Sequence, residues 1–256
     1  MAWYDDPEHP FAGIAEKLKR ADQNIVNLHN EILAFFQSCK YPVIPNPDDK
    51  EWKEVVNYHR NLPIPKRFGV LAGEIVHHLR SSLDHIVWIF SDDTSKTLHE
   101  NALEFPIFAK AMSKDDLRRY KRKIHGIANI RVRTLVEKLQ PYQSGTAAIN
   151  HPLCVVHDMD RFDKHRELVI VTSCASVEFP ELPADLVRII ATYAKTKAVA
   201  TEDVRAFQRA IKYDGKVTPQ VAFAKFGDRK DQFVVPSLAH LLDAVGDVTD
   251  LFAREL

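Results

Sequence analysis

The sequence has few glycines, few cysteines and no excess of charge of either sign. Only eight of its 256 residues are glycine, and neither GxxxxGK[ST] nor GxGxxG occurs, so phosphate-cradling loops of the familiar kinds are excluded. The nucleophile pattern GxSxG and the zinc pattern HExxH are also absent. Lysine plus arginine and aspartate plus glutamate both total 35, so no overall basic field indicates nucleic acid. A local basic patch remains compatible with an RNA-binding role.

Long apolar runs and cysteine pairs are missing as well. No run approaches the roughly 18 residues that a membrane span requires, and the acidic start MAWYDDPEHPF lacks the apolar core of a signal peptide. The three cysteines, Cys39, Cys154 and Cys174, show no CxxC spacing, so we interpret them as reduced thiols. These features predict a cytoplasmic protein that makes no contact with a membrane.

Hydrophobic periodicity predicts mostly helices. Apolar residues recur at alternating spacings of four and three from Ile14 to Phe35, which is typical of a long helix over 11–38. Further helices are expected over 67–90, 113–123, 130–139, 147–165, 184–195 and 237–254. Ser113, followed by Asp115 and Asp116, is a good N-terminal signal for the helix over 113–123. The segment 91–101 is expected to be a polar loop, and 103–108 a buried crossing.

Strands are expected mainly in the C-terminal half. The β-branched stretch 168–177 is typical of a buried strand, and 217–226 and 232–235 predict two more strands joined by a turn at 227–231. Imperfect alternation over 51–59 suggests an edge strand. We therefore predict an α+β fold, predominantly α: a helical bundle around a central helix, with a small β-sheet in the C-terminal half. We expect one domain over 1–256, mainly helical over 1–166 and containing the sheet and a final helix over 167–256.

The central helix, 67–90, carries the most unusual polar face. Ile75, Leu79, Leu83 and Ile86 lie on an apolar stripe. The opposite side holds Glu74, His78, Ser81 and His85, flanked by His77, Arg80 and Asp84. Because buried titratable groups need partners, this band should meet other polar groups or line a cleft. We expect it to meet the segment 157–166, whose run Asp163-Lys164-His165-Arg166 could complete a pocket with Arg80, Asp84 and His85. The same run is equally typical of a helix C-terminus whose last turn is rich in cations and has no further role.

Three sequence features carry a resemblance to known families. The motifs GEIVHHLRSSLDHIVW, FPIF and DKHR are similar to those of a family of uncharacterised bacterial proteins with LRSxLDH and DKHR motifs. More distantly, Arg80 and His85 have the Arg-x4-His spacing of the HEPN superfamily of helical ribonucleases. That resemblance implies a metal-independent endoribonuclease, of the kind used as a toxin or a phage-defence effector, which acts on RNA as a homodimer. HEPN ribonucleases usually place Asn, His or Asp after the arginine, where this chain has Ser81.

The resemblance assigns roles to residues of this chain. Arg80 would clamp the phosphate, and His85 would handle the proton of the 2′-hydroxyl or of the leaving group. Asp84 and His165 complete the candidate catalytic set. The candidate substrate-binding residues are Ser81, His78, Lys164, Arg166 and Asp163. No cofactor and no metal are assigned.

Two other interpretations stay open. Arg80 and Asp84 are four residues apart and can pair inside a polar core layer, in a non-catalytic protein that binds a ligand or a partner. A metal-dependent hydrolase is the third possibility, because Glu74 and His77 form one ExxH, and His78 or His85 could join Asp163 and His165 around one ion. The basic run Lys114 to Lys123 is either a solvated helix face or an RNA-binding strip.

Overall fold

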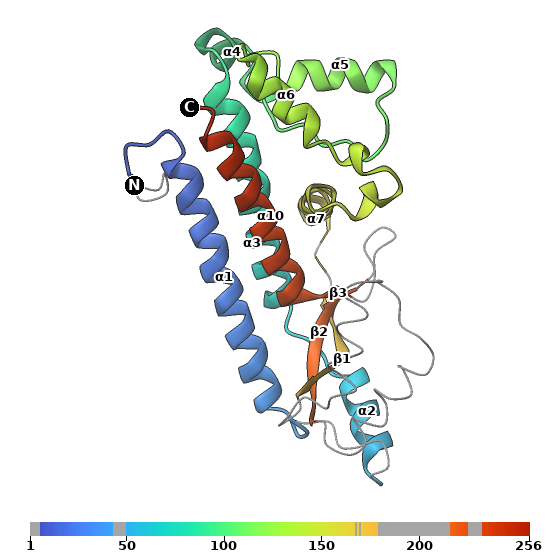
Figure 1. The fold of residues 1–256 in the computed structure, drawn as a ribbon. Helices are drawn as coiled ribbons and strands as arrows, with labels where there is room; N and C mark the ends of the chain where they lie inside the picture. The colour runs from blue at the N-terminus through green and yellow to red at the C-terminus, as the bar shows by residue number, and fades with distance from the viewer. Residues whose placement is uncertain (1–5, 43–49, 167, 169, 179–215, 225–231) are drawn as a thin grey trace, which may run out of the picture. The chain divides into compact units, whose positions relative to one another are not determined.

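The computed structural model describes residues 6–42, 50–166, 168, 170–178, 216–224 and 232–256. The fold is α+β and predominantly α, with a three-stranded antiparallel sheet in the C-terminal half, as the sequence predicts (Figure 1). The chain forms two compact units. The first consists of residues 1–29, 66–169 and 234–256, and the second of residues 30–65 and 170–233. Within the described residues, no helix combines the length and the apolar character that a membrane crossing requires.

The core of the first unit is built on α3 (Arg67–Phe90), which packs against α7 (Pro152–His165) and α10 (Val234–Ala253). Ile75, Leu79, Leu83 and Ile86 of the predicted apolar stripe are fully buried. Burying each such side chain stabilises the fold by about 1.5–3 kcal/mol. The stripe therefore faces the core, as the periodicity predicts, and fixes which α3 residues face outward.

An aromatic cluster closes one end of this core. The ring of Phe90 lies 6.1 Å from that of Phe11 and 6.1 Å from that of Phe252, which in turn lies 6.0 Å from Phe105. These spacings are typical of edge-to-face and tilted aromatic pairs. Phe105 belongs to the FPIF segment, so the buried crossing expected over 103–108 is confirmed.

The remaining helices of the first unit are short, apart from the long α1. Their bounds are α1 (Ala12–Gln37), α4 (Asp93–Leu98), η2 (Glu100–Ala102), α5 (Lys114–Lys123), α6 (Ile130–Lys138) and η3 (Pro141–Asn150). The unit boundary falls within α1, after residue 29. Ile14, Ala21 and Leu28 of α1 are buried, so the predicted seam is confirmed, and Phe36 rather than Phe35 is buried near its end.

The second unit contains α2 (Trp52–Arg60) and the sheet. Strands β1 (Ile170–Glu178), β2 (Lys216–Phe223) and β3 (Gln232–Phe233) follow one another in the order β1-β2-β3. Strand β1 pairs antiparallel with β2 from Ile170 opposite Phe223, and the register shifts between Cys174 and Ser176. The three predicted strands are thus confirmed with small changes at their ends.

Several predicted elements were wrong in type or in extent. Residues 51–59 were expected to form an edge strand, but they form α2, whose buried residues Val55 and His59 are four apart as one helical face requires. The expected loop 91–101 contains α4, which begins because the side chain of Asp92 accepts the backbone N–H of Ser95.

Two helix starts were also displaced. Helix α7 begins at Pro152, not at 147, because proline suits the first helical position and the His151 side chain caps the helix. Helix α10 begins at Val234, before Pro236, because proline is tolerated in a first turn. The predicted helix 184–195 and the predicted turn 227–231 lie outside the described residues.

Candidate functional site

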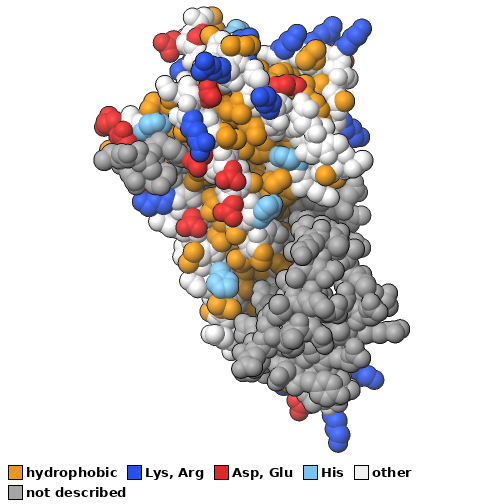
Figure 2. Space-filling model, viewed as in Figure 1, with side chains coloured by type: hydrophobic (Ala, Val, Ile, Leu, Met, Phe, Trp, Pro, Cys, Tyr) orange, Lys and Arg blue, Asp and Glu red, His pale blue; other side chains and the backbone are white. Residues whose placement is uncertain are grey.

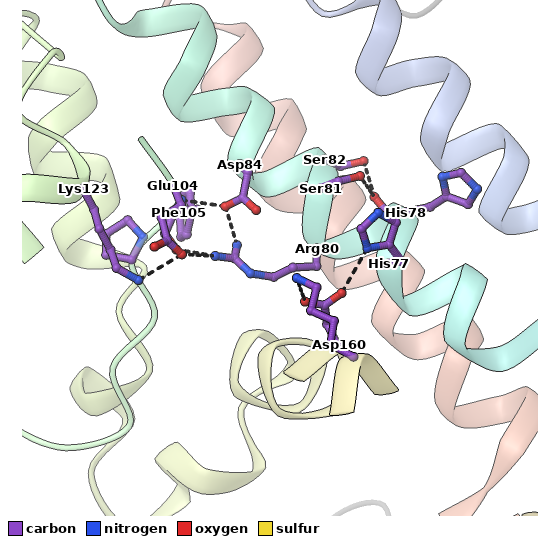
Figure 3. A network of polar contacts seen from close by, with 12 residues as sticks. His77, His78, Arg80, Ser81, Ser82, Asp84, Glu104, Phe105, Lys123 and Asp160 are labelled. Carbon is purple, nitrogen blue, oxygen red and sulfur yellow. Dashed lines mark hydrogen bonds and ion pairs between the residues drawn. The ribbon is translucent and has the colours of Figure 1, made fainter. Parts of the chain in front are cut away.

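Helix α3 carries two polar clusters, both within the first unit. Figure 3 shows the one around Arg80, and of the other it shows His77 with Asp160. We call the first the Arg80 network; it consists of Arg80, Asp84, Glu104, Lys123 and the backbone of Phe105. We call the second the His77 groove. It is lined by Val70, Gly73, Glu74, His77, Asp163 and Arg166.

The guanidinium of Arg80 is buried and held by three groups. The Arg80 side chain is 4% exposed, and its Nη1 lies 2.9 Å from Oδ1 of Asp84. Its Nη2 donates to the carbonyl of Phe105 at 3.0 Å and lies 3.4 Å from Oε2 of Glu104. These partners neutralise the guanidinium inside the protein, which a buried charge requires.

The acidic members of the network connect α3 to other segments. Oδ1 of Asp84 accepts the backbone N–H of Phe105 at 2.8 Å, and Oε2 of Glu104 lies 3.1 Å from Nζ of Lys123 on α5. Burial raises the pKa of Asp84, although Arg80 and the Phe105 N–H both act to lower it. The network therefore ties α3 to the 103–108 crossing and to α5.

His157 of α7 lies close enough to this network for the charge of Arg80 to affect the pKa of its ring. Burial and, as the next largest cause, the positive charge of Arg80 lower the pKa of His157 to about 4. Its ring is consequently neutral at neutral pH.

The His77 groove contains a histidine that is oriented by a buried carboxylate. Nδ1 of His77 lies 3.2 Å from Oδ1 of Asp160, and the other oxygen of Asp160 lies 2.7 Å from Nζ of Lys164. The side chain of Asp160 is 6% exposed, whereas that of His77 is 61% exposed. Because a carboxylate only accepts hydrogen bonds, Nδ1 of His77 carries the proton, and the neutral ring presents the lone pair of Nε2.

The floor of the groove depends on a glycine. A Cβ placed on Gly73 would lie 2.5 Å from Oδ2 of Asp163, so only glycine lets this carboxyl rest directly on α3. The groove has a volume of about 410 Å³ and brings together carboxylates (Glu74, Asp163), an imidazole (His77) and a guanidinium (Arg166). It can therefore both transfer protons and pair with an anion.

The surroundings of Asp163 favour the protonated form of its carboxyl. Burial raises the pKa of its carboxyl, and the nearby charge of Asp160 raises it further. The backbone N–H of Leu168 and the imidazole of His77 act in the opposite direction. A raised pKa increases the fraction of Asp163 that carries a proton, and this carboxyl lines the same groove as His77.

The remaining predicted residues lie elsewhere. Nε2 of His85 lies 3.3 Å from Nζ of Lys17 on α1, and burial lowers the pKa of both His85 and His78. The hydroxyl of Ser81 donates to the backbone carbonyl of His78. His165 is exposed in the last turn of α7.

The predicted residues thus fall into separate groups. Asp163 and Arg166 line the groove, and Lys164 supports it through Asp160. The polar cluster of α3 was expected to meet the 157–166 segment, and it does so through His77 and Asp160. The described contact of Asp163 on α3 is with Gly73, earlier along the helix than Arg80, Asp84 and His85.

The sequence prediction underrated two residues of the groove. His77 was placed only on the flank of the polar face, and Asp160 was not predicted as a site residue. The available signals were the density of acid and imidazole in the stretch HDMDRFDKH and the i,i+4 spacing of Asp160 and Lys164.

Comparisons with known proteins add no relatives. The chain matches no protein-family model, no curated protein and no solved structure. Within the part of the chain that the structure describes, no group of three or more His, Cys, Asp or Glu residues is placed to hold a metal ion.

Proposed function

We propose that this chain is a ribonuclease that cleaves RNA by acid–base catalysis in the His77 groove. The observation that carries the proposal is the exposed His77, whose ring is oriented by the buried carboxylate of Asp160. A histidine oriented through one ring nitrogen is suited to general-base catalysis through the other. Lys164 holds Asp160 in place through a 2.7 Å ion pair.

The residues of the groove match the requirements of RNA transesterification. None of the six lining residues is Ser, Thr or Cys, so the groove itself offers no hydroxyl or thiol nucleophile. RNA supplies its own nucleophile, the ribose 2′-hydroxyl. The protein then needs to contribute only a base, an acid and a cation for the phosphate.

The proposed step balances protons and bonds. Nε2 of His77 takes the proton of the 2′-hydroxyl while O2′ forms a bond to phosphorus. The bond from phosphorus to O5′ breaks, and O5′ receives the proton of the Asp163 carboxyl. Arg166 stabilises the charge that develops on the phosphate oxygens. The products are a 2′,3′-cyclic phosphate and a 5′-hydroxyl end.

This proposal keeps the reaction that the HEPN resemblance implies but moves the chemistry to other residues. Under the resemblance, Arg80 would clamp the phosphate, yet its guanidinium is 4% exposed and engaged by Asp84 and Glu104. Arg166 is exposed and lines the groove beside His77, which is the position a phosphate clamp needs.

The test is cleavage of end-labelled RNA by the purified protein in EDTA, with the wild type compared with His77→Ala and Asp160→Asn. Loss of a general base is expected to reduce the rate about 10²–10⁴-fold, and the asparagine should act similarly by upsetting the tautomer of His77. His29→Ala, at an exposed position on α1, is the matched control and should cleave like the wild type. Cleavage that survives in both His77→Ala and Asp160→Asn would refute the assignment of His77 as the general base.

A second candidate is a non-catalytic protein that binds a small ligand in the same groove. It is favoured by the mixture of charges there, with Arg166 and Glu74 able to pair with opposite groups of one zwitterionic molecule. If the chain has this second function, neither the wild type nor any variant should cleave RNA. It would instead gain thermal stability from a zwitterionic ligand, and Arg166→Gln would lose that gain.

A further inference from the structure

A second surface of the first unit concentrates positive charge. We call it the basic surface, and it consists of Lys110, Lys114, Arg118, Arg119, Lys121 and Arg122. All six side chains are exposed, and Figure 2 shows Lys and Arg side chains gathered at the upper right, where Figure 1 places α5. Between 110 and 123 the sequence has seven Lys or Arg and only two Asp, although the whole chain has 35 of each sign. The charge is therefore segregated locally.

Helix stability explains only part of this pattern. Cations in a last turn interact favourably with the helix dipole, which accounts for Lys121 and Arg122. The dipole effect does not extend to Lys114, Arg118 and Arg119, which lie earlier in the helix. Arg118 pairs with Asp115 at 3.1 Å; among the described residues no carboxylate lies within ion-pair distance of Lys121 or Arg122.

The outward face of α5 does not suit a membrane. A helix that lies in a membrane interface needs a broad apolar face turned outward. Here Tyr120 and Ile124 are buried in the unit. Among the described large apolar side chains of α5, Leu117 alone is exposed. The face is polar and cationic along its ten residues, a length of about 15 Å.

We propose that the basic surface binds the phosphate backbone of single-stranded RNA. Exposed Lys and Arg side chains along one helix match a chain of regularly spaced phosphates, and such contacts position a strand without reading its sequence. Choosing RNA as the polyanion rests on the proposed function. Lys123 joins the surface to the Arg80 network through Glu104, which fixes the base of α5 against α3.

The test measures binding of a fluorescein-labelled single-stranded RNA of mixed sequence by anisotropy, at several salt concentrations. The variant is Lys121→Glu/Arg122→Glu, made on a His77→Ala background so that no cleavage occurs. We expect at least a tenfold weaker affinity and a salt slope smaller by about 1.4, because each phosphate contact to a single strand contributes about 0.7. A milder variant, Lys121→Gln/Arg122→Gln, should show a smaller loss in the same direction.

The matched control carries the same charge change elsewhere. Lys53→Glu/Arg60→Glu reverses two exposed cations on α2, in the second unit. An equal loss of affinity in both double variants would overturn the proposal, because total charge alone would then explain binding. Polyglutamate or anionic lipid vesicles that compete as well as RNA would overturn it in favour of an acidic protein or a membrane.

Failure of this inference can be distinguished from failure of the proposed function. A protein that binds RNA through Lys121 and Arg122 but cleaves none refutes the ribonuclease and supports the basic surface. A protein that cleaves RNA with an unchanged KM in Lys121→Glu/Arg122→Glu refutes the basic surface and supports the ribonuclease.

Discussion

At the scale of single residues, Arg80 illustrates how burial limits the use of a charge. Its guanidinium is surrounded by Asp84, Glu104 and the carbonyl of Phe105, so its donors are directed at the protein itself. Removing one partner of a buried ion pair is costly because the other charges remain behind, uncompensated. We therefore interpret Arg80 as a residue that joins α3 to the neighbouring crossing.

This interpretation predicts the behaviour of Arg80→Met. We expect a loss of about 3 kcal/mol in the free energy of unfolding, measured in urea, because Asp84 loses its cation; Glu104 keeps its ion pair with Lys123. The matched control is Arg118→Met, which removes an arginine that is 82% exposed and should cost less than about 1 kcal/mol. The folded fraction of Arg80→Met should still cleave RNA if the His77 groove carries the chemistry. A folded variant with about 10²–10³-fold less activity would instead support the arginine clamp of the HEPN resemblance.

The sequence could anticipate the Arg80 network only in part. Arg80 and Asp84 are four residues apart on one helix, so their pairing follows from helical geometry. Glu104 and Phe105 lie more than 20 residues further along the chain, and only the fold brings them to Arg80. The same limit applies to His77 and Asp160, which are 83 residues apart.

At the scale of secondary structure, the elements that the sequence predicts best carry their own signals. Helix α5 begins with a capping box between Ser113 and Asp116, and α3 has an uninterrupted apolar stripe. Helix α2 was mistaken for a strand because its apolar residues alternate imperfectly, and α4 was missed because its six residues are nearly all polar. The packing of α7 on α3 could not be predicted, because the two helices are far apart in the sequence; at one point it places Asp163 against Gly73.

That glycine gives a prediction at the same scale. Gly73→Ala should lower the stability of the protein by up to about 2 kcal/mol, because the new methyl group would displace the carboxyl of Asp163 and the gain in helix propensity offsets only part of that cost. Gly246→Ala in α10 is the control; nothing lies within 4 Å of its Cβ, so it should stabilise the helix by up to about 1 kcal/mol. Chemical denaturation of both variants measures the difference. A Gly73→Ala protein as stable as the wild type would show that α7 does not depend on this contact.

At the scale of the whole molecule, the first unit is assembled from three separate stretches of chain. Residues 1–29, 66–169 and 234–256 form one core, and the sheet belongs to the second unit. Sequence patterns describe neighbours along the chain, so the prediction of a helical part followed by a sheet part did not include this interleaving. The histidines of the folded chain also couple its stability to pH.

Five described histidines have a pKa that burial lowers below its usual range: His59, His78, His85, His151 and His157. In the unfolded chain these rings take up protons near pH 6.5, whereas in the folded protein they do so only at lower pH. Between those values the unfolded state binds more protons, so stability is full above pH 6.5 and declines as the pH falls. The raised pKa of Asp84 and of Asp163 acts in the opposite direction, because a folded carboxyl that holds its proton more tightly gains stability as the pH falls.

The largest of these contributions is expected from His157. A shift of its pKa from 6.5 to about 4 corresponds to about 3 kcal/mol of stability lost between those two pH values. His157→Gln should therefore reduce the slope of unfolding free energy against pH in this window, measured by urea denaturation at intervals of half a pH unit. His240→Gln changes an exposed histidine of α10 and should leave the slope unaltered. If His157→Gln and the wild type lose stability in parallel from pH 6.5 to 4, then His157 already binds its proton in the folded protein, and the packing of α7 against Arg80 is looser than the structure indicates.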